Sequence, residues 1–570
     1  MNRTTVKAIT AAGILAVAVA ACSSSPSSST PKSSSTSSSA QGQPMVIVDN
    51  TGQVWTNTYN PYIATSLSSE ENMQSLTYEP LLEFNVLNPT AAPIPWLATG
   101  YTWSNGGKTL TFTIRSGVKF SDGTPMTASD VAYTFTMLAH NSSLGSQAPG
   151  PTPNVTSATA PDSTTAVLNF AQAEYANLYL IASTYIVPQH VWSTVSDPAK
   201  YADSNPVGTG PYVVSSFSSQ KVVFKENPYY WQKSMVHVPE LIFPSYVSNT
   251  TANPALEAGE IDYAGNDVAN VQSDFLNANS DYHTWTSSQP WFASNNVVSL
   301  ILNVTKAPLN DPKVRLAISA GIDRQQLSAQ GETNYEPAAS SSSGLLLPID
   351  NALLDPSYSN DLSATSNDAK VTSILKSDGY TLTGGKWMKN GQPIKFSIQD
   401  PTSYTDYATD ATLIANQLDA EGFEVTFDGV QPTQWYANYP VGSFQAMIHW
   451  GAQGNSPYDY FENWIDYSES APVGTAATSD WGRFDDPAAQ AALTQFAASD
   501  SASAQQAALN TLEGIVSTQA PVIPLLYGAA WYEYSTKNYT GWPTESNPYI
   551  SPVPNSPFME YTLLHLTPAS

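Results

Sequence analysis

The sequence predicts an α/β protein with more than one domain, and three observations support this prediction. The chain has 570 residues, far more than a single hydrophobic core usually serves, so two or three domains are expected. Residues 103–138 have the pattern of a strand, a turn and a helix. Residues 394–427 have the pattern of a strand, a helix and a second strand, which favours a parallel pair joined by a crossover helix.

The unit at 103–138 can be justified residue by residue. Residues 109–115 alternate polar and apolar side chains, as a strand with one buried face does. Turn-forming residues follow at 121–125. Thr127 and Asp130 have the spacing of a capping box that opens a helix. The apolar face of that helix is expected to hold Val131, Phe135 and Leu138.

Further elements follow in chain order. Short apolar strands are expected at 45–48, 221–225 and 298–302. A helix is expected from Pro312, since the first turn of a helix tolerates proline. Its apolar stripe comprises Val314, Ala317, Ile318 and Ile322.

The region from 394 to 450 predicts an α/β domain. Alternating strands are expected around 394–398 and 423–427, and another strand at 444–450. The helix between the first two strands would be ended by Gly422. Its apolar face is expected to hold Tyr407, Ala411, Ile414 and Leu418.

The amino-terminal residues predict export and a tether. Residues 1–21 combine basic residues with an apolar run and contain no acidic residue, which is typical of a signal peptide and too short for a convincing membrane span. Residues 19–22, Val-Ala-Ala-Cys, resemble the lipobox of bacterial lipoproteins, so Cys22 is the expected lipid anchor. The alternative is an ordinary cleavage site with an idle thiol. Residues 22–43 are rich in Ser and should form a flexible tether.

Composition excludes several classes of protein. A formal net charge of −26 argues against binding nucleic acid, or an anionic membrane surface, through a basic patch. One cysteine cannot form an intrachain disulfide, a Cys-rich zinc site or an iron–sulfur cluster. Only 12% of residues are charged, while 31 are Tyr and 14 are Trp, so the surface should suit uncharged polar ligands.

Four motifs in a fixed order give a specific resemblance. These are Tyr-Glu-Pro-Leu at 78–81, Pro-Trp-Leu-Ala at 95–98, the run at 111–125 and Thr-Ala-Ser-Asp-Val at 127–131. Together they resemble the signature of family 5 extracellular solute-binding proteins. The resemblance implies a two-lobed periplasmic-binding-protein-like α/β fold, type II, in its large three-subdomain variant. It also implies a monomeric receptor, anchored to the outer face of the cytoplasmic membrane through lipid alone, that delivers a small solute to the permease subunits of an ABC importer.

The resemblance also suggests how the lobes are assembled from discontinuous segments. Lobe I would comprise residues 44–77, 205–296 and 520–570, with residues 78–204 as an additional subdomain. Lobe II would comprise residues 298–519.

Ligands of open α/β sheets bind beyond the carboxyl ends of the strands, which places the candidate site after the strand at 444–450. In peptide-binding relatives a Trp-x-x-Asp element there pairs with the ligand's ammonium group. In this chain Trp450 is followed by Gln453 at the aspartate position. A neutral amide cannot replace that charge-assisted pairing. The resemblance to the family favours an oligopeptide, whereas Gln453 favours a neutral ligand such as a β-linked oligosaccharide. We predict an oligopeptide-like ligand first and a β-linked oligosaccharide second.

Other candidate ligand-binding residues are Asn455, His449, Glu79 and Tyr527. Glu79 and Tyr527 match family positions near the ligand groove, although each is equally well explained as a turn or lobe-contact residue. Aromatic side chains that could stack on a sugar are plentiful, but most of them are expected in the core. They are Trp291, Phe292, Trp435, Tyr436, Trp450 and Trp464.

No enzyme or metal site is predicted, and no cofactor. The sequence has none of the hydrolase, P-loop, metalloprotease or dinucleotide-binding motifs. The six histidines are scattered singly, and only His449 lies near the expected site. A secreted glycoside hydrolase remains the distant alternative because acidic pairs such as Asp485 and Asp486 occur, although nothing marks one as a proton donor.

Overall fold

The computed structural model describes residues 42–49, 55–63, 73–141, 144, 155–451 and 454–570. The predicted signal peptide, Cys22, nearly all of the tether and Gln453 lie outside the described residues. Among the described helices, none combines the length and the apolar character that a membrane crossing requires.

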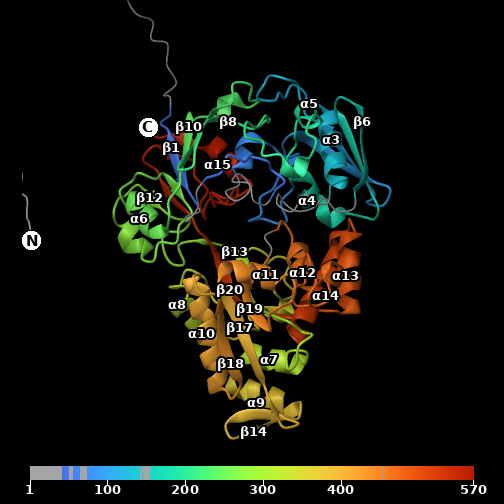
Figure 1. The fold of residues 1–570 in the computed structure, drawn as a ribbon, viewed down its shortest axis with the longest axis vertical. Helices are drawn as coiled ribbons and strands as arrows, with labels where there is room; N and C mark the ends of the chain where they lie inside the picture. Colours follow the sequence, from blue (N-terminus) through green and yellow to red (C-terminus); the bar gives the residue numbers. More distant parts are fainter. Residues whose placement is uncertain (1–41, 50–54, 64–72, 142–143, 145–154, 452–453) are drawn as a thin grey trace, which may run out of the picture. The chain divides into compact units, whose positions relative to one another are not determined.

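The first large sheet is assembled from segments that are far apart in the sequence. Within the described residues it has seven strands, in the order β12, β21, β11, β1, β10, β9, β8 (Figure 1). The predicted strands at 45–48 and 221–225 are confirmed as β1 and β9. The bounds are β1 (Met45–Val48), β8 (Tyr212–Ser218), β9 (Lys221–Glu226), β10 (Glu240–Pro244), β11 (Tyr263–Ala264), β12 (Tyr282–His283) and β21 (Glu533–Ser535).

A four-stranded antiparallel sheet contains the predicted strand, turn and helix. Its described strands are β4 (Ala98–Ser104), β5 (Thr109–Ile114), β7 (Thr165–Phe170) and β6 (Val155–Asp162), in that order. Helix α3 (Ala128–Ala139) follows, and Thr127 and Asp130 form the expected capping box. The Thr127 N–H donates to Asp130 Oδ2 at 2.8 Å. Val131, Phe135 and Leu138 are buried, so this prediction is confirmed.

The second large sheet has five strands in the described part of the chain, in the order β18, β17, β19, β13, β20. β17 and β18 pair in parallel over seven residues, which confirms the predicted crossover. β13 runs antiparallel to both β19 and β20. The bounds are β13 (Ala293–Leu302), β17 (Lys395–Pro401), β18 (Glu424–Val430), β19 (Ala446–Trp450) and β20 (Val522–Ala530).

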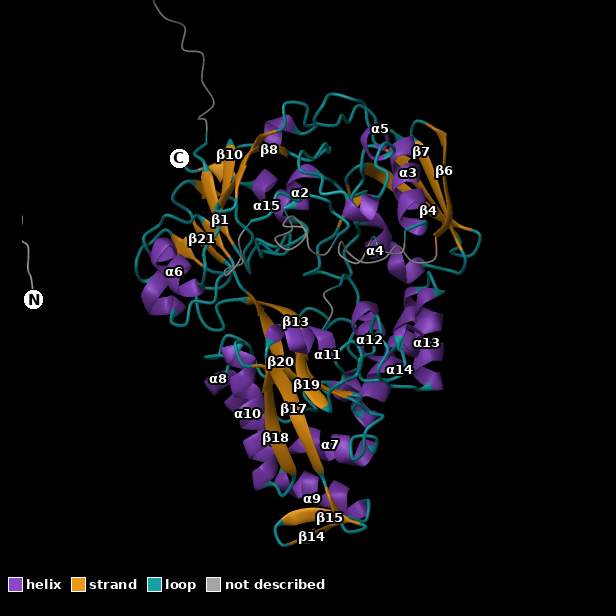
Figure 2. Ribbon diagram, viewed as in Figure 1, coloured by secondary structure: helices purple, strands orange, loops and turns teal. Residues whose placement is uncertain are grey.

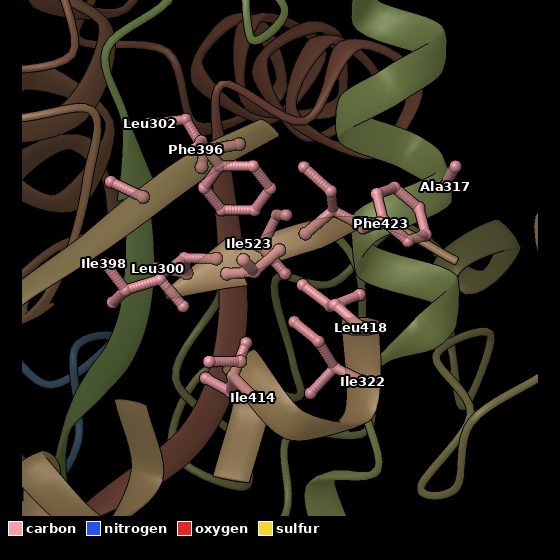
Figure 3. Packing of buried hydrophobic residues seen from close by; sticks show 14 of the residues in the cluster. Leu300, Leu302, Ala317, Ile322, Phe396, Ile398, Ile414, Leu418, Phe423 and Ile523 are labelled. Atoms are coloured by element: carbon pink, nitrogen blue, oxygen red, sulfur yellow. The ribbon is translucent and has the colours of Figure 1, made fainter. Parts of the chain in front are cut away.

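Both faces of the five-stranded sheet are covered by helices (Figure 2). Alternate residues of β13 point to opposite faces: Leu300 and Leu302 join the core beneath α7 and α10, while Val297 and Ile301 join the core beneath α12 to α14. Figure 3 shows the first core, in which Ile414 and Leu418 of α10 meet residues of β13 and β17. Burial on both faces explains the near-continuous apolar runs in these strands.

Several described helices begin at a side-chain cap, among them α3, α7 and α8. Asp311 caps α7 through the Lys313 N–H at 2.9 Å, with Pro312 in the first turn as predicted. The remaining described helices are α2 (Gln74–Thr77), α4 (Leu178–Ala182), α5 (Gln189–Trp192), α6 (Asn249–Glu257), α7 (Pro312–Gly321), α8 (Arg324–Gln330), α9 (Asp368–Ser377), α10 (Thr405–Ala420), α11 (Pro432–Asn438), α12 (Pro457–Ile465), α13 (Pro487–Ala497), α14 (Ala502–Gln519) and α15 (Met559–His565).

Short sheets complete the described elements. They pair β2 (Leu82–Glu83) with β3 (Ile94–Pro95), β22 (Tyr539–Thr540) with β23 (Thr567–Pro568), and β14 (Thr381–Thr383) with β15 (Lys386–Lys389) and β16 (Gln392–Pro393). The expected lobe boundary at residue 520 falls just before β20, whose register with β13 places it in the five-stranded sheet.

Candidate functional site

The candidate site lies at one edge of the five-stranded sheet, where its parallel strands end. β17, β18 and β19 run in the same direction, so their carboxyl ends share an edge. β20 also ends there, because it and β19 are both antiparallel to β13. At this same edge β13 enters the sheet and β20 leaves it towards β21. The edge is therefore both the usual ligand position of an α/β sheet and the place where the chain passes between the two large sheets.

Trp450 is the last residue of β19 and belongs to an aromatic cluster at this edge. It is half-buried and stacks on Tyr407 of α10, with ring centroids 6.4 Å apart and planes at 29°. Trp435 of α11 lies 5.8 Å from it on another side. The Trp450 ring is thus placed beside the amino-terminal part of α10.

His449 lies inside the same cluster. Its ring stacks on Trp435 at 5.0 Å and contacts Tyr439 and Trp481 at 5.3 and 4.6 Å. Burial lowers the pKa of His449 to about 4, against the opposing effect of its 2.5 Å hydrogen bond with the Trp450 carbonyl oxygen. The imidazole is therefore neutral at neutral pH and packed among rings.

Carboxyl groups gather beside this aromatic cluster, and sequence reasoning missed them. Phe396, Ile398 and Asp400 alternate on one face of β17, so Asp400 ends the strand on the face that α10 covers. Asp406 and Asp410 stand one turn apart on α10. Electrostatic interactions connect these carboxyls with Glu332 and Glu336, which follow α8. We call Glu332, Glu336, Asp400, Asp406 and Asp410 the carboxyl cluster.

Burial and mutual repulsion make these groups reluctant to ionise. Burial raises the pKa of Asp400 to about 8, with Asp406 and Asp410 adding to the rise and the Ile448 backbone amide opposing it. Burial raises the pKa of Glu336 to about 7, although its Oε1 accepts a hydrogen bond from the Ala529 N–H at 3.0 Å. The pKa values of Glu332 and Asp410 are also raised, first by burial and then by their acidic neighbours.

The loop that carries Glu332 and Glu336 contacts the chain next to the seven-stranded sheet. Tyr335 lies between the two glutamates, and its hydroxyl donates to the carbonyl oxygen of Ala269 at 2.9 Å and accepts from the Val271 N–H at 3.1 Å. Asp267, an exposed residue of that segment, interacts electrostatically with Asp406. A carboxyl group of the segment after β11 of the first sheet therefore lies near a carboxyl group of α10, which covers the second sheet.

The other predicted site residues lie in different surroundings. Asn455 borders a pocket of 390 Å³ that is also lined by Tyr175, Tyr179 and Phe496. Tyr527 borders a pocket of 790 Å³ near the start of β13, and its hydroxyl accepts from the Ser340 N–H at 3.2 Å.

Glu79 is fully buried. It accepts hydrogen bonds from Tyr230 Oη at 3.1 Å and Trp231 Nε1 at 3.0 Å, while burial raises its pKa to about 7. The described candidates therefore do not converge on one pocket, and Gln453 lies outside the described residues.

The six aromatic candidates divide by exposure. Most are buried, as the sequence suggested, and the exceptions are the half-buried Trp450 and the exposed Tyr436. The buried ones are Trp291, Phe292, Trp435 and Trp464. In the part of the chain that the structure describes, His, Cys, Asp and Glu side chains form no group of three or more placed to hold a metal ion.

Comparison with known proteins shows which family this chain belongs to. Residues 92–471 match the family model of bacterial extracellular solute-binding proteins, family 5 Middle. The chain belongs to this family. The resemblance inferred from the four motifs is therefore confirmed.

Family 5 relatives differ in what they bind. The chain is 29% identical to the nickel-binding periplasmic protein of Escherichia coli K12, over 70% of this chain and 74% of that protein. It is 23% identical to the periplasmic murein peptide-binding protein MppA of the same organism, over 76% of this chain and 79% of that protein.

Solved structures of family 5 proteins confirm the predicted two-lobed α/β fold. An oligopeptide-binding protein of Thermotoga maritima, crystallised with mannohexaose, matches with a TM-score of 0.76 and 23% identity, over 93% of this chain and 99% of that one. The oligopeptide-binding protein AppA of Bacillus subtilis, in complex with a nonapeptide, matches with a TM-score of 0.70 and 18% identity, over 93% of this chain and 100% of that one.

One sequence signal could have revealed the carboxyl cluster. Asp410 falls between Tyr407 and Ile414 at helical spacing, so a carboxyl group stands within the apolar stripe of α10. Such a group is costly to bury without a partner. Glu332 and Glu336 lie on a loop, and no periodicity points to their position.

Proposed function

We propose that the protein is the substrate-binding subunit of an ABC importer, which captures an oligopeptide-like solute between two lobes and delivers it to the permease. Family membership over residues 92–471 is the observation that carries this proposal. The path of the chain also supports it: the chain enters the five-stranded sheet through β13 and leaves it through β20 at the edge proposed for the ligand. A ligand that touches both lobes would favour their closed arrangement.

The lobes are proposed as predicted from the sequence, with one adjustment. Residues 44–77, 205–296 and 520–570 would contribute to lobe I, residues 78–204 to its additional subdomain and residues 298–519 to lobe II. β20 would be shared, as a connecting strand that pairs with β13 of the five-stranded sheet. The receptor would act as a monomer.

Two tests address the ligand class. The full chain, solubilised in detergent, is incubated with a tetrapeptide pool or with pooled β-linked oligosaccharides, separated by gel filtration and analysed by native mass spectrometry. We expect retained peptides and, by small-angle X-ray scattering, a smaller radius of gyration in the loaded protein. Retention of oligosaccharides alone would replace the peptide assignment, and their hydrolysis would instead indicate a glycoside hydrolase.

An oligosaccharide ligand is the second candidate. The stacked rings of Trp450 and Tyr407 offer a surface of the kind that sugar rings pack against. The relative from Thermotoga maritima was crystallised with mannohexaose.

Membrane attachment through Cys22 is a separate proposal with its own test. The lipobox-like residues before Cys22 support it. We expect Cys22→Ala to move the protein from the membrane fraction to the soluble fraction, since one thiol carries the anchor. Ser23→Ala is the matched control and should leave the distribution unchanged. Membrane association of Cys22→Ala equal to that of the wild type would contradict lipidation.

A further inference from the structure

We propose that the carboxyl cluster selects a solute that carries an organic cation, an ammonium or guanidinium group, which docks at Asp406 beside the Trp450 and Tyr407 rings. This inference rests on the proposed receptor function and names the chemistry of its ligand. In peptide-binding relatives an aspartate pairs with the peptide's amino group, and this chain has Gln453 at that position. The carboxyl cluster would pair with the amino group instead.

Asp400 is a buried carboxyl group to which no described side chain donates. It is 1% exposed, neither of its oxygens has a hydrogen bond of good geometry among the described residues, and only the nearby Ile448 backbone amide favours its charged form. It faces Asp406 and Asp410, with which it interacts electrostatically. Ionisation of this group is unfavourable while no cation is near, so a cation arriving at Asp406 would favour the charged form of the cluster.

The carboxyl cluster has no ion-pair partner among the described residues, because none of their salt bridges involves one of its members. The segments from residue 50 onwards that the structure leaves undescribed contain no Lys or Arg in their sequence. Neither the undescribed segments after residue 50 nor the salt bridges therefore supply a Lys or Arg side chain to the carboxyl cluster.

The surroundings of the carboxyl cluster favour an organic cation over a metal ion. Among the described residues no acidic group has the arrangement that would hold a metal. Tyr407 interacts with the carboxyls of the cluster, and its ring stacks on that of Trp450. Aromatic faces attract ammonium and guanidinium groups, and the half-buried Asp406 is the accessible member of the cluster. Asp267 faces it from the other side.

The binding test uses matched probes with the full chain in detergent. The probes are a tetrapeptide pool without Lys, Arg or His, the same pool after N-acetylation, and mannohexaose. We expect the free-amine pool to bind in isothermal titration calorimetry and N-acetylation to weaken binding at least 100-fold. Asp406→Asn should weaken binding of the free-amine pool at least 10-fold, whereas Asp500→Asn, an exposed change between α13 and α14, should have no effect.

Each outcome bears on a different claim. Equal binding of the acetylated pool or of mannohexaose by the wild type and Asp406→Asn would overturn the cation assignment and leave the receptor function standing. Binding of none of the three probes would contradict both.

A ligand-free measurement checks the cluster independently of any probe. Asp400→Asn keeps the side-chain shape and removes one of the repelling charges, so we expect a higher melting temperature than the wild type at pH 8. Asp500→Asn should not change it. A lower melting temperature for Asp400→Asn would show that protein partners already hold this carboxylate, and the assignment would fall.

Discussion

Trp450 joins the aromatic cluster to Tyr407, the ring that interacts with the carboxyl cluster. Its ring contacts Trp435 and His449 on the packed side and Tyr407 on the α10 side. His449 cannot compensate for its loss, because that imidazole is neutral and enclosed by rings. A side chain that is half-buried in the free protein can contribute to binding without being essential for folding.

We therefore expect Trp450→Ala to reduce ligand affinity at least tenfold, equivalent to about 1.4 kcal/mol, because the ligand loses an aromatic contact surface. Calorimetric titration with the tetrapeptide pool measures the affinity, and thermal denaturation measures the stability. Trp103→Ala is the matched control: Trp103 is also half-buried and contacts Tyr175 at 5.1 Å in the four-stranded sheet region. Unchanged affinity in Trp450→Ala would remove this residue from the site.

At the scale of elements, helix α3 shows how local sequence sets a boundary. At its first turn Thr127 Oγ1 accepts from the Ser129 N–H at 3.3 Å, and the Thr127 N–H donates to Asp130 Oδ2 at 2.8 Å. Asp130 Oδ1 also accepts from the Gln189 N–H at 3.0 Å, so the same cap fixes α5 against α3. The cap is therefore a tertiary contact as well as a local one.

Thr127→Ala should lower the free energy of unfolding by about 1 kcal/mol, the usual cost of losing an N-cap side chain. Chemical denaturation of the full chain measures this difference. Ser129→Ala is the control, since Ser129 is exposed and takes part in the cap through its backbone N–H. Equal stability of Thr127→Ala and the wild type would show that Asp130 alone maintains the start of the helix.

Elements with a strong local pattern could be predicted from the sequence, and the site could not. The strand at 109–114, the cap at Thr127 and the parallel pair β17 and β18 were predicted because periodicity and capping are local properties. The carboxyl cluster joins a strand end, one turn of α10 and a loop after α8, which meet only in the folded chain. Trp450 was predicted through the family motif, whereas the burial of His449 depends on Trp435 and Trp481.

At the scale of the whole molecule, buried carboxyl groups recur well outside the candidate site. Burial raises the pKa of Glu560 to about 8 and that of Asp350 and Asp459 to about 7. Exposed carboxyls such as Asp162 have lowered pKa values, because backbone and side-chain hydrogen bonds from Thr164 favour the charged form. The buried groups dominate the dependence of stability on pH, since solvent screens the exposed ones.

The sign of this dependence follows from the raised pKa values. A carboxyl whose pKa is higher in the folded state keeps its proton there after the unfolded chain has lost it. Its stabilisation is complete below the unfolded value near 4 and is lost as pH rises through 7 to 8. Each such group removes about 1.4 kcal/mol per pH unit within that window.

We therefore expect the melting temperature of the full chain to fall by about 5 to 10 °C as the pH is raised from 5 to 8. Differential scanning calorimetry at constant ionic strength measures it. Glu560→Gln should fall less steeply than the wild type, because its amide cannot ionise, and Asp500→Asn should follow the wild-type curve. A melting temperature that rises from pH 5 to pH 8 would mean that the buried carboxyls are ionised and paired in the folded protein, against the raised pKa values on which the carboxyl cluster also depends.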